Sequence, residues 1–157
     1  MTTPIWTTYW HRQWAPFCWI LYVLAAGIFG IAWILRLDPL ASVILSGVGV
    51  LMLLLAASFH HLTVSDEGVR LLVVFGPVPL FRRNIRYDDI REVEIGRTMI
   101  LDGWGIHLSF RGGWVWNIWG RDCVVLRLRR GVIRIGTDDA ENLARFVQDR
   151  LTAEADQ

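Results

Sequence analysis

The sequence of 157 residues contains no lysine, and all 16 of its basic residues are arginine. This excludes a P-loop NTPase and a Schiff-base enzyme, because both sites need a lysine ammonium group. The motifs G-x-S-x-G, H-E-x-x-H and C-x-x-C are also absent, which removes three further classes of hydrolytic and redox site. We therefore expect no catalytic residues and no enzymatic activity.

Cysteine is almost as scarce, with only Cys18 and Cys123. Cys18 lies in an apolar stretch and Cys123 begins an apolar strand pattern far from it, so we expect no disulfide between them. The adjacent pair His60-His61 has no Cys, Asp or Glu at ligand spacing, and neighbouring residues of an extended segment point to opposite faces. The sequence therefore predicts neither a metal site nor a cofactor.

Charged residues are missing from two long stretches, residues 17–35 and 40–59. As a helix, each spans about 28–30 Å, close to the thickness of the hydrocarbon core of a bilayer. Pro39, in the polar break between them, can begin a helix but not continue one. The alternative is a pair of buried helices, but the residues after 59 are too few to cover two helices that are apolar all round. We predict a transmembrane hairpin over residues 17–59.

The charges around the two predicted spans set the expected orientation. Arg12 precedes the first span and Arg70 follows the second, while Arg36 in the break is offset by Asp38. Positive charge favours the cytoplasmic side, and so does the lack of a disulfide. We expect a multi-pass protein of the inner (cytoplasmic) membrane with both termini in the cytoplasm. Neither span contains an ionisable residue, so a transporter or channel is not expected.

Residues 1–16 form a segment rich in tryptophan. Trp6, Trp10 and Trp14 are spaced by four residues, which places them on one stripe if the segment is helical. Tryptophan favours the headgroup layer, so we predict an interfacial segment that leads into the first span. The alternative is a tryptophan face that docks a partner protein.

Residues 60–151 change to a period of two, which is typical of half-buried strands. Alternation or apolar runs separated by glycine and proline predict short strands near residues 62–65, 69–75, 81–86, 90–96, 106–110, 114–119, 123–128 and 132–136. Asp138 and Glu141 have the spacing of a capping box, followed by a helical apolar stripe to about residue 151. We expect an α+β protein: the hairpin, then an antiparallel barrel or sandwich of about seven strands closed by one helix. Residues 152–157 are expected to be a frayed tail.

Three short motifs carry a resemblance to a known family: residues 102–106 (DGWGI), 113–120 (GWVWNIWG) and 135–139 (IGTDD). Over residues 62–151 the chain resembles bacterial pleckstrin-homology-like (PH-like) membrane proteins, in which a two-helix hairpin precedes the domain. The resemblance implies the fold, membrane association, and a role as a binding or scaffolding module. Lipid-binding members of the wider superfamily use basic residues at the first hairpin loop, but here residues 65–68 are acidic, so no lipid site is carried over.

Charge is divided along the soluble part: residues 60–134 hold 12 Arg against 8 acidic residues, and residues 135–157 hold 2 Arg against 6. This balance is too even for a nucleic-acid-binding surface. Arg82, Arg83 and Arg86 are the best candidate patch for anionic lipid headgroups. The alternative is an ordinary solvated strand face.

Four tryptophans lie within 16 residues. On a strand, Trp114 and Trp116 share one face, predicted to be core, while Trp119 lies on the other. We predict that Trp104 and Trp119 bind a partner, because an apolar second face needs a cover. The sequence thus favours a non-enzymatic membrane-tethered module that binds a protein partner or its own copies, with a lipid-headgroup sensor as the alternative. It shows no small-molecule substrate.

Overall fold

The computed structural model describes residues 8–16, 18–77, 80–99 and 103–155, which form an α+β protein with two sheets. The hairpin helices are α1 (Cys18–Ile34) and α2 (Pro39–Ser58), and the C-terminal helix is α3 (Ala140–Ala155). The strands are β1 (Trp10–Trp14), β2 (His61–Asp66), β3 (Arg70–Phe75), β4 (Arg82–Arg86), β5 (Ile90–Arg97), β6 (Gly105–Leu108), β7 (Trp114–Asn117), β8 (Asp122–Leu128) and β9 (Val132–Gly136), with a 3-10 turn η1 (Tyr87–Asp89) before β5.

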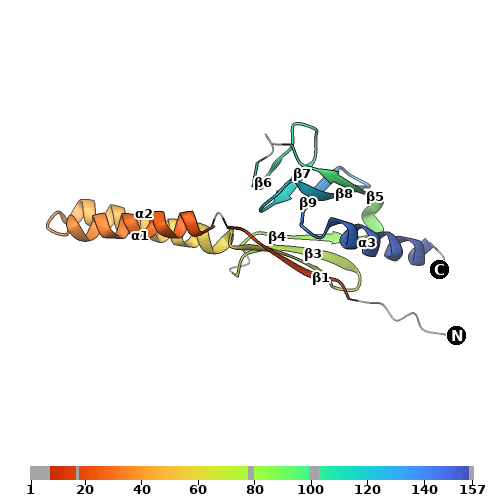
Figure 1. Cartoon of the computed structure of the whole chain (residues 1–157), viewed down its shortest axis with the longest axis horizontal. Helices are drawn as coiled ribbons and strands as arrows, with labels where there is room; N and C mark the ends of the chain where they lie inside the picture. Colours follow the sequence, from red (N-terminus) through yellow and green to blue (C-terminus); the bar gives the residue numbers. More distant parts are fainter. Residues whose placement is uncertain (1–7, 17, 78–79, 100–102, 156–157) are drawn as a thin grey trace.

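Helices α1 and α2 form an antiparallel pair that projects from the sheets (Figure 1). Asp38 caps α2 by accepting a hydrogen bond from the Ala41 backbone N–H at 3.2 Å, and Pro39 is the first helical residue, as predicted. Among the described residues, α2 is the one helix long and apolar enough to cross a membrane. α1 is equally apolar but, at 17 residues, two shorter than the predicted span.

Trp10–Trp14 form a strand, so the predicted helical stripe is wrong there, while the interfacial placement remains a prediction. β1 pairs antiparallel with β2, with Trp10 opposite Ser65 and Trp14 opposite His61. A spacing of four residues places side chains on one face of a strand as well as of a helix, so the two structures share this signature. Trp6 lies outside the described residues. The domain that contains the sheets therefore includes residues on both sides of the hairpin.

Of the two predicted alternatives, an antiparallel barrel or sandwich, the closed barrel is wrong, because the strands form two separate sheets. The first has the order β1-β2-β3-β4 and the second β5-β8-β9-β7-β6, nine strands in all among the described residues. The second sheet is also not wholly antiparallel, since β7 pairs parallel with β9. The inner faces pack on one another around a shared core: Leu62, Val64, Leu71, Val73, Phe75, Ile85, Trp116, Ile118, Val124, Leu126, Ile133 and Ile135. The predicted strands from residue 62 onward are confirmed, and none of their ends differs by more than two residues.

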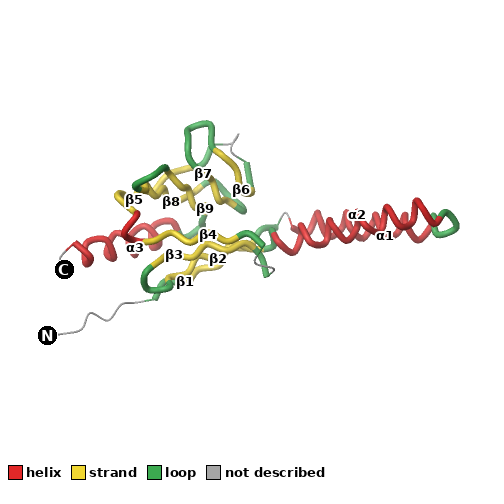
Figure 2. Tube along the Cα trace, turned by 180° about the vertical axis from the view of Figure 1, so that it is seen from behind, coloured by secondary structure: helices red, strands yellow, loops and turns green. Residues whose placement is uncertain are grey.

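α3 lies between the two sheets, at the side bounded by β1 and β5 (Figure 2). The ring of Phe146 stacks on Tyr9 at 5.5 Å, and Leu143 and Val147 are buried in the core. α3 begins at Ala140, so Asp139 directly precedes it and not the predicted Asp138, whose carboxylate contacts His11. The helix runs to Ala155, so the predicted frayed tail begins too early.

A close backbone crossing joins the domain to the hairpin. Gly76 has a φ of 64° and passes so near the carbonyl groups of Ala57 and Ser58 that a side chain would not fit there. Its N–H donates to the carbonyl oxygen of His61 at 2.7 Å. The end of β3 is thereby held against the end of α2, so the sheet edge that follows β3 lies near the base of the hairpin.

Candidate functional site

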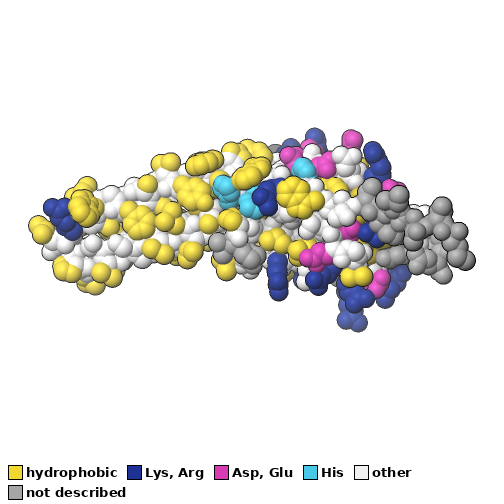
Figure 3. Space-filling model, turned by 90° about the horizontal axis from the view of Figure 1, so that it is seen from below, with side chains coloured by type: hydrophobic (Ala, Val, Ile, Leu, Met, Phe, Trp, Pro, Cys, Tyr) yellow, Lys and Arg dark blue, Asp and Glu magenta, His cyan; other side chains and the backbone are white. Residues whose placement is uncertain are grey.

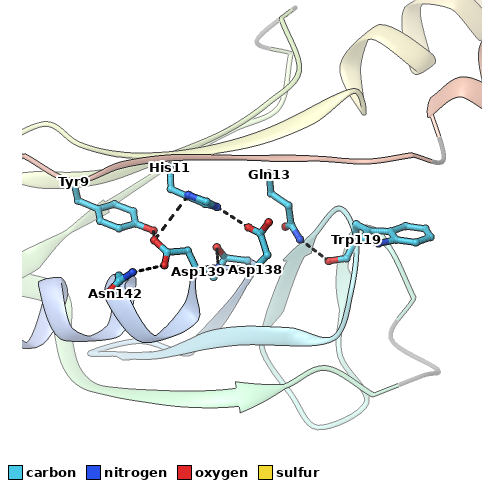
Figure 4. Close-up of polar contacts among 8 residues, drawn as sticks. Tyr9, His11, Gln13, Trp119, Asp138, Asp139 and Asn142 are labelled. Atoms are coloured by element: carbon cyan, nitrogen blue, oxygen red, sulfur yellow. Dashed lines mark hydrogen bonds and ion pairs between the residues drawn. The ribbon is translucent and has the colours of Figure 1, made fainter.

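A polar cluster ties β1 to the loop before α3 (Figure 4). The Tyr9 hydroxyl donates to Asp139 Oδ2 at 3.0 Å, and His11 Nε2 lies 2.6 Å from Asp138 Oδ1. Asn142 Nδ2 donates to Asp139 Oδ1 at 2.6 Å. These contacts join residues about 130 positions apart in the chain, so the cluster fixes β1 and α3 relative to each other.

The electrostatics of the cluster favour this structural role. Burial, and then the carboxylate of Asp139, raise the pKa of Tyr9 far above its ordinary value, so the phenol stays protonated and donates. Among the described residues, His, Cys, Asp and Glu side chains are nowhere grouped so that three of them could hold a metal ion. The cluster therefore positions elements of the fold.

A second contact of β1 leads to the predicted tryptophan surface. Gln13 Nε2 donates to the backbone oxygen of Trp119 at 3.1 Å. The rings of Trp119 and Trp104 are stacked, with centroids 4.6 Å apart and planes at 26°. Trp119 follows the end of β7 and is 37% exposed, while Trp104 is 50% exposed. The structure thus brings together the two residues that the sequence placed at a partner surface.

The stacked pair, which we call the Trp pair, lies in a hollow beside the hairpin. One pocket of about 430 Å³ is lined by Thr98, Met99, Gly103, Trp104, Trp119, Gly120 and Arg121. A smaller one of about 170 Å³ is lined by Ala15, Leu21, Phe59, Trp104, Gly105 and Ile118. Leu21 belongs to the first turns of α1 and Phe59 follows α2, so the Trp pair is at the base of the hairpin.

The other two tryptophans divide between core and surface. Trp116 is 7% exposed and its ring lies 5.7 Å from that of Phe75 across the two sheets, as predicted for a core residue. Trp114 is 46% exposed, so its predicted place in the core is wrong. Trp114 pairs with Leu108 at the end of the short strand β6 and lines an open groove with Arg82 and Arg83 of the opposite sheet.

The predicted arginine patch is split along β4. Arg86 pairs with Arg70 at the far end of the sheet and forms a salt bridge of 2.8 Å with Asp88. The hydrogen bond from Arg86 lowers the pKa of Asp88, so both groups are charged at neutral pH. Arg82 and Arg83 lie at the end nearer the hairpin and have no acidic partner within 4 Å in the described chain.

The register reveals an additional arginine that the sequence analysis did not select. Arg12, Thr63, Val74 and Arg82 lie in one row across the four strands, on the outer face of the first sheet. The Arg12 guanidinium lies 5.2 Å from the ring of Trp10 and 6.0 Å from that of Trp14. Figure 3 shows arginine side chains over this part of the molecule, next to the hydrophobic helices. The alternation Trp-x-Arg-x-Trp was the signal in the sequence.

Aromatic and imidazole rings surround the junction of hairpin and sheet. The ring of His60 lies 4.9 Å from Trp14 and 6.4 Å from Trp19. Burial lowers the pKa of His61, and the positive charge of Arg12 lowers it further. Such rings favour the headgroup layer of a bilayer. Trp14, predicted for the membrane interface, is thus placed beside the helices that would enter it.

No family model matches the chain, and no curated protein matches it. The PH-like resemblance remains a prediction.

Proposed function

We propose that this protein is a non-enzymatic, membrane-tethered PH-like module that binds a protein partner, or copies of itself, at the cytoplasmic face. The anchor would be the hairpin of α1 and α2, crossing the bilayer twice. α2 has 20 residues, about 30 Å of helix, and matches the hydrocarbon core. α1 lies along it and also exposes apolar side chains, so both helices would enter the same layer.

The orientation is tested with single cysteines in a background that lacks Cys18 and Cys123. We expect an impermeant thiol reagent to label Asp38→Cys, at the hairpin tip, from outside intact cells. Arg130→Cys, in the exposed turn after β8, should be labelled only after permeabilisation. Labelling of Arg130→Cys in intact cells would place the domain outside and refute the cytoplasmic assignment.

The observation that supports partner binding is the Trp pair. Two large rings are stacked, substantially exposed, and beside a pocket of about 430 Å³ at the base of the hairpin. Aromatic anchors of this kind contribute a large part of the binding energy at protein interfaces. A membrane tether would also concentrate the partner near this surface.

The expected effect of Trp119→Ala is loss of association without loss of folding. A buried aromatic anchor at an interface is worth about 2 kcal/mol or more, roughly a thirtyfold weaker complex. Two differently tagged copies, co-expressed and purified in mild detergent, test self-association, and mass spectrometry of the co-purified proteins tests other partners. The control is Trp10→Ala, an exposed tryptophan on the outer face of β1. Equal recovery of partners with both variants would remove the Trp pair from the interface.

A lipid-headgroup sensor is the second candidate, supported by the free charges of Arg82 and Arg83 and the row that links Arg82 to Arg12. A soluble variant can test it, because Ala15 N donates to His60 O and the chain ends around the hairpin are adjacent. Replacing residues 17–58 by Gly-Asn-Gly leaves a loop of five residues between Ala15 and His60, a length common in β-hairpins.

We expect this hairpin-free variant to bind vesicles containing phosphatidylglycerol weakly and to dissociate as salt is raised, because screening acts within about 8 Å at physiological ionic strength. Arg82→Gln and Arg83→Gln should each weaken binding about fivefold, the equivalent of about 1 kcal/mol. Arg86→Gln is the control, since Arg86 is paired with Asp88. Unchanged sedimentation with vesicles in the Arg82→Gln/Arg83→Gln variant would refute the lipid hypothesis.

A further inference from the structure

The two sheets are open on two sides, and α3 covers one of them. It packs on β5, on β8 and on the η1 turn after β4, and its Phe146 stacks on Tyr9, just before β1. On the opposite side the boundary strands are β4 and β6, which end their respective sheets. No strand pairing joins β4 to β6 among the described residues, so this side of the sandwich is open.

The edge of β4 carries a row of backbone groups without a strand partner. One backbone hydrogen bond to the β3 side lies at each end of β4. At one end Phe75 N donates to Phe81 O at 3.0 Å, and at the other Tyr87 N donates to Val69 O at 3.4 Å. Hydrogen-bonded positions alternate in an antiparallel pair, so the odd-numbered positions of β4 face β3. The N–H and C=O groups that point away from β3 are those of Arg82, Asn84 and Arg86.

The edge of β6 has the same property. Ser109 N donates to Gly113 O at 2.9 Å, so these two residues form a hydrogen-bonded pair between β6 and β7. Hydrogen-bonded pairs alternate along an antiparallel ladder, so His107 and Gly105 are also bonded to β7. The backbone groups of Ile106 and Leu108 therefore point away from β7. Two unpaired strand edges thus face the same opening.

The opening is a groove with an apolar floor and a basic wall. Its volume is about 250 Å³, and it is lined by Leu80, Phe81, Arg82, Arg83, Ile106, Trp114 and Trp116. Arg83 lies opposite Val73, whose side chain is buried between the sheets, so Arg83 is on the inner face of the first sheet. Neither Arg82 nor Arg83 forms a salt bridge in the described chain, whereas Arg70, Arg97, Arg127 and Arg150 all do.

We propose that the groove between β4 and β6 binds an extended segment of a protein partner that alternates acidic and apolar side chains. Such a segment would pair with the free edge of β4, since a strand added to a sheet edge gains backbone hydrogen bonds. Its apolar side chains would point to the inner face, over Trp114 and Ile106 and beside the stem of Arg83. Its carboxylates would point to the outer face and meet Arg82, whose guanidinium matches a carboxylate in bidentate geometry. This inference rests on the proposed function, because it specifies the chemistry of the protein partner proposed there.

A lipid headgroup fits the groove less well. Phosphate oxygens can accept hydrogen bonds from arginine and from backbone N–H groups, but they offer nothing to the free C=O groups of the edge. Inward-pointing charge at an edge also serves, in many proteins, to prevent association. If Arg83 had only this protective role, its removal would increase self-association of the protein and would not affect the binding of a peptide.

The test uses the full chain in nanodiscs of phosphatidylcholine and a display library of random octapeptides. We expect enrichment, relative to empty nanodiscs, of peptides that alternate acidic and apolar residues. For an enriched peptide labelled with fluorescein, anisotropy should show binding at least tenfold weaker to the Arg82→Gln/Arg83→Gln variant. Arg129→Gln/Arg130→Gln, in the exposed turn after β8, removes the same charge elsewhere and should bind normally.

Asn84→Pro provides an independent variant, because it removes one edge-facing N–H without removing a bond to β3. It should abolish binding while the melting temperature stays close to that of the native chain. No enrichment, enriched peptides without acidic residues, or normal binding by Asn84→Pro would each overturn the proposal. Increased self-association of the Arg82→Gln/Arg83→Gln variant without any peptide binding by the native chain would also overturn it and assign both arginines to edge protection.

The groove and the Trp pair can be tested separately as binding surfaces. Trp114→Ala should weaken peptide binding, whereas Trp119→Ala, in the Trp pair, should not. Peptide binding that depends on Trp119 and not on Trp114 would overturn the groove while leaving the Trp pair as the partner surface. If the groove variants weaken peptide binding as expected but Trp119→Ala recovers partners normally, the groove is retained as a binding site and the Trp pair is not.

Discussion

Trp116→Ala is expected to unfold the soluble domain or bring it close to unfolding. Trp116 is 7% exposed and contacts Phe75 on the opposite sheet, so truncation leaves a cavity where the two sheets meet. Loss of a buried tryptophan costs roughly 3–5 kcal/mol, which is a large part of the 5–15 kcal/mol that stabilises an ordinary domain. Urea denaturation of the hairpin-free variant, followed by circular dichroism, measures the change in the free energy of unfolding.

Trp119→Ala is the matched control for this experiment. The Trp119 side chain is 37% exposed, and its main structural contact to β1 is a backbone oxygen that the substitution retains. We expect a loss of about 1 kcal/mol or less, as for most surface positions. Equal destabilisation by the two substitutions would mean that the Trp pair is part of the core, and the partner surface would lose its support.

Asp66→Ala is expected to be the most destabilising change of a charged residue. The side chains of Asp66 and Arg150 are 3% and 13% exposed and form a salt bridge of 2.7 Å between β2 and α3. Asp66 also accepts hydrogen bonds from Tyr87 and from the Gly68 backbone N–H. Removal of one member of a buried pair leaves the other charge uncompensated and costs about 3–5 kcal/mol.

Asp88→Ala provides the comparison, because the salt bridge of Asp88 with Arg86 is exposed on both sides. Solvent and salt screen exposed pairs, so the denaturation midpoint should hardly move. If Asp66→Ala is as mild as Asp88→Ala, the contact between β2 and α3 does not help to hold the helix over the sandwich. The packing of Leu143 and Val147 would then be sufficient.

The sequence alone predicted most elements of the fold. Alternation from residue 62 onward located the strands of both sheets, and the stripe that includes Leu143 and Val147 located α3. Pro39 marked the start of α2 because proline has no N–H to donate, and the first helical position needs none. These are local properties, since period and capping depend on neighbours within a few residues.

The same local signals misassigned β1, because Trp10 and Trp14 share a face in a helix and in a strand. The deciding interaction is the pairing of Trp14 with His61, which lie on opposite sides of the hairpin in the sequence. Likewise, the sequence grouped Arg82, Arg83 and Arg86, but Asp88 neutralises only the last of them.

For the candidate sites, the sequence by itself determined which residue types are present: arginine without lysine, four clustered tryptophans, and two stretches without charge. Only the tertiary structure decided that Trp104 stacks on Trp119, that Trp114 is exposed while Trp116 is buried, and that α3 covers one open side of the sandwich and leaves β4 and β6 uncovered. The physical reason is that burial and strand pairing depend on partners distant in the chain, whereas alternation shows only that a side chain has a face, not what covers it.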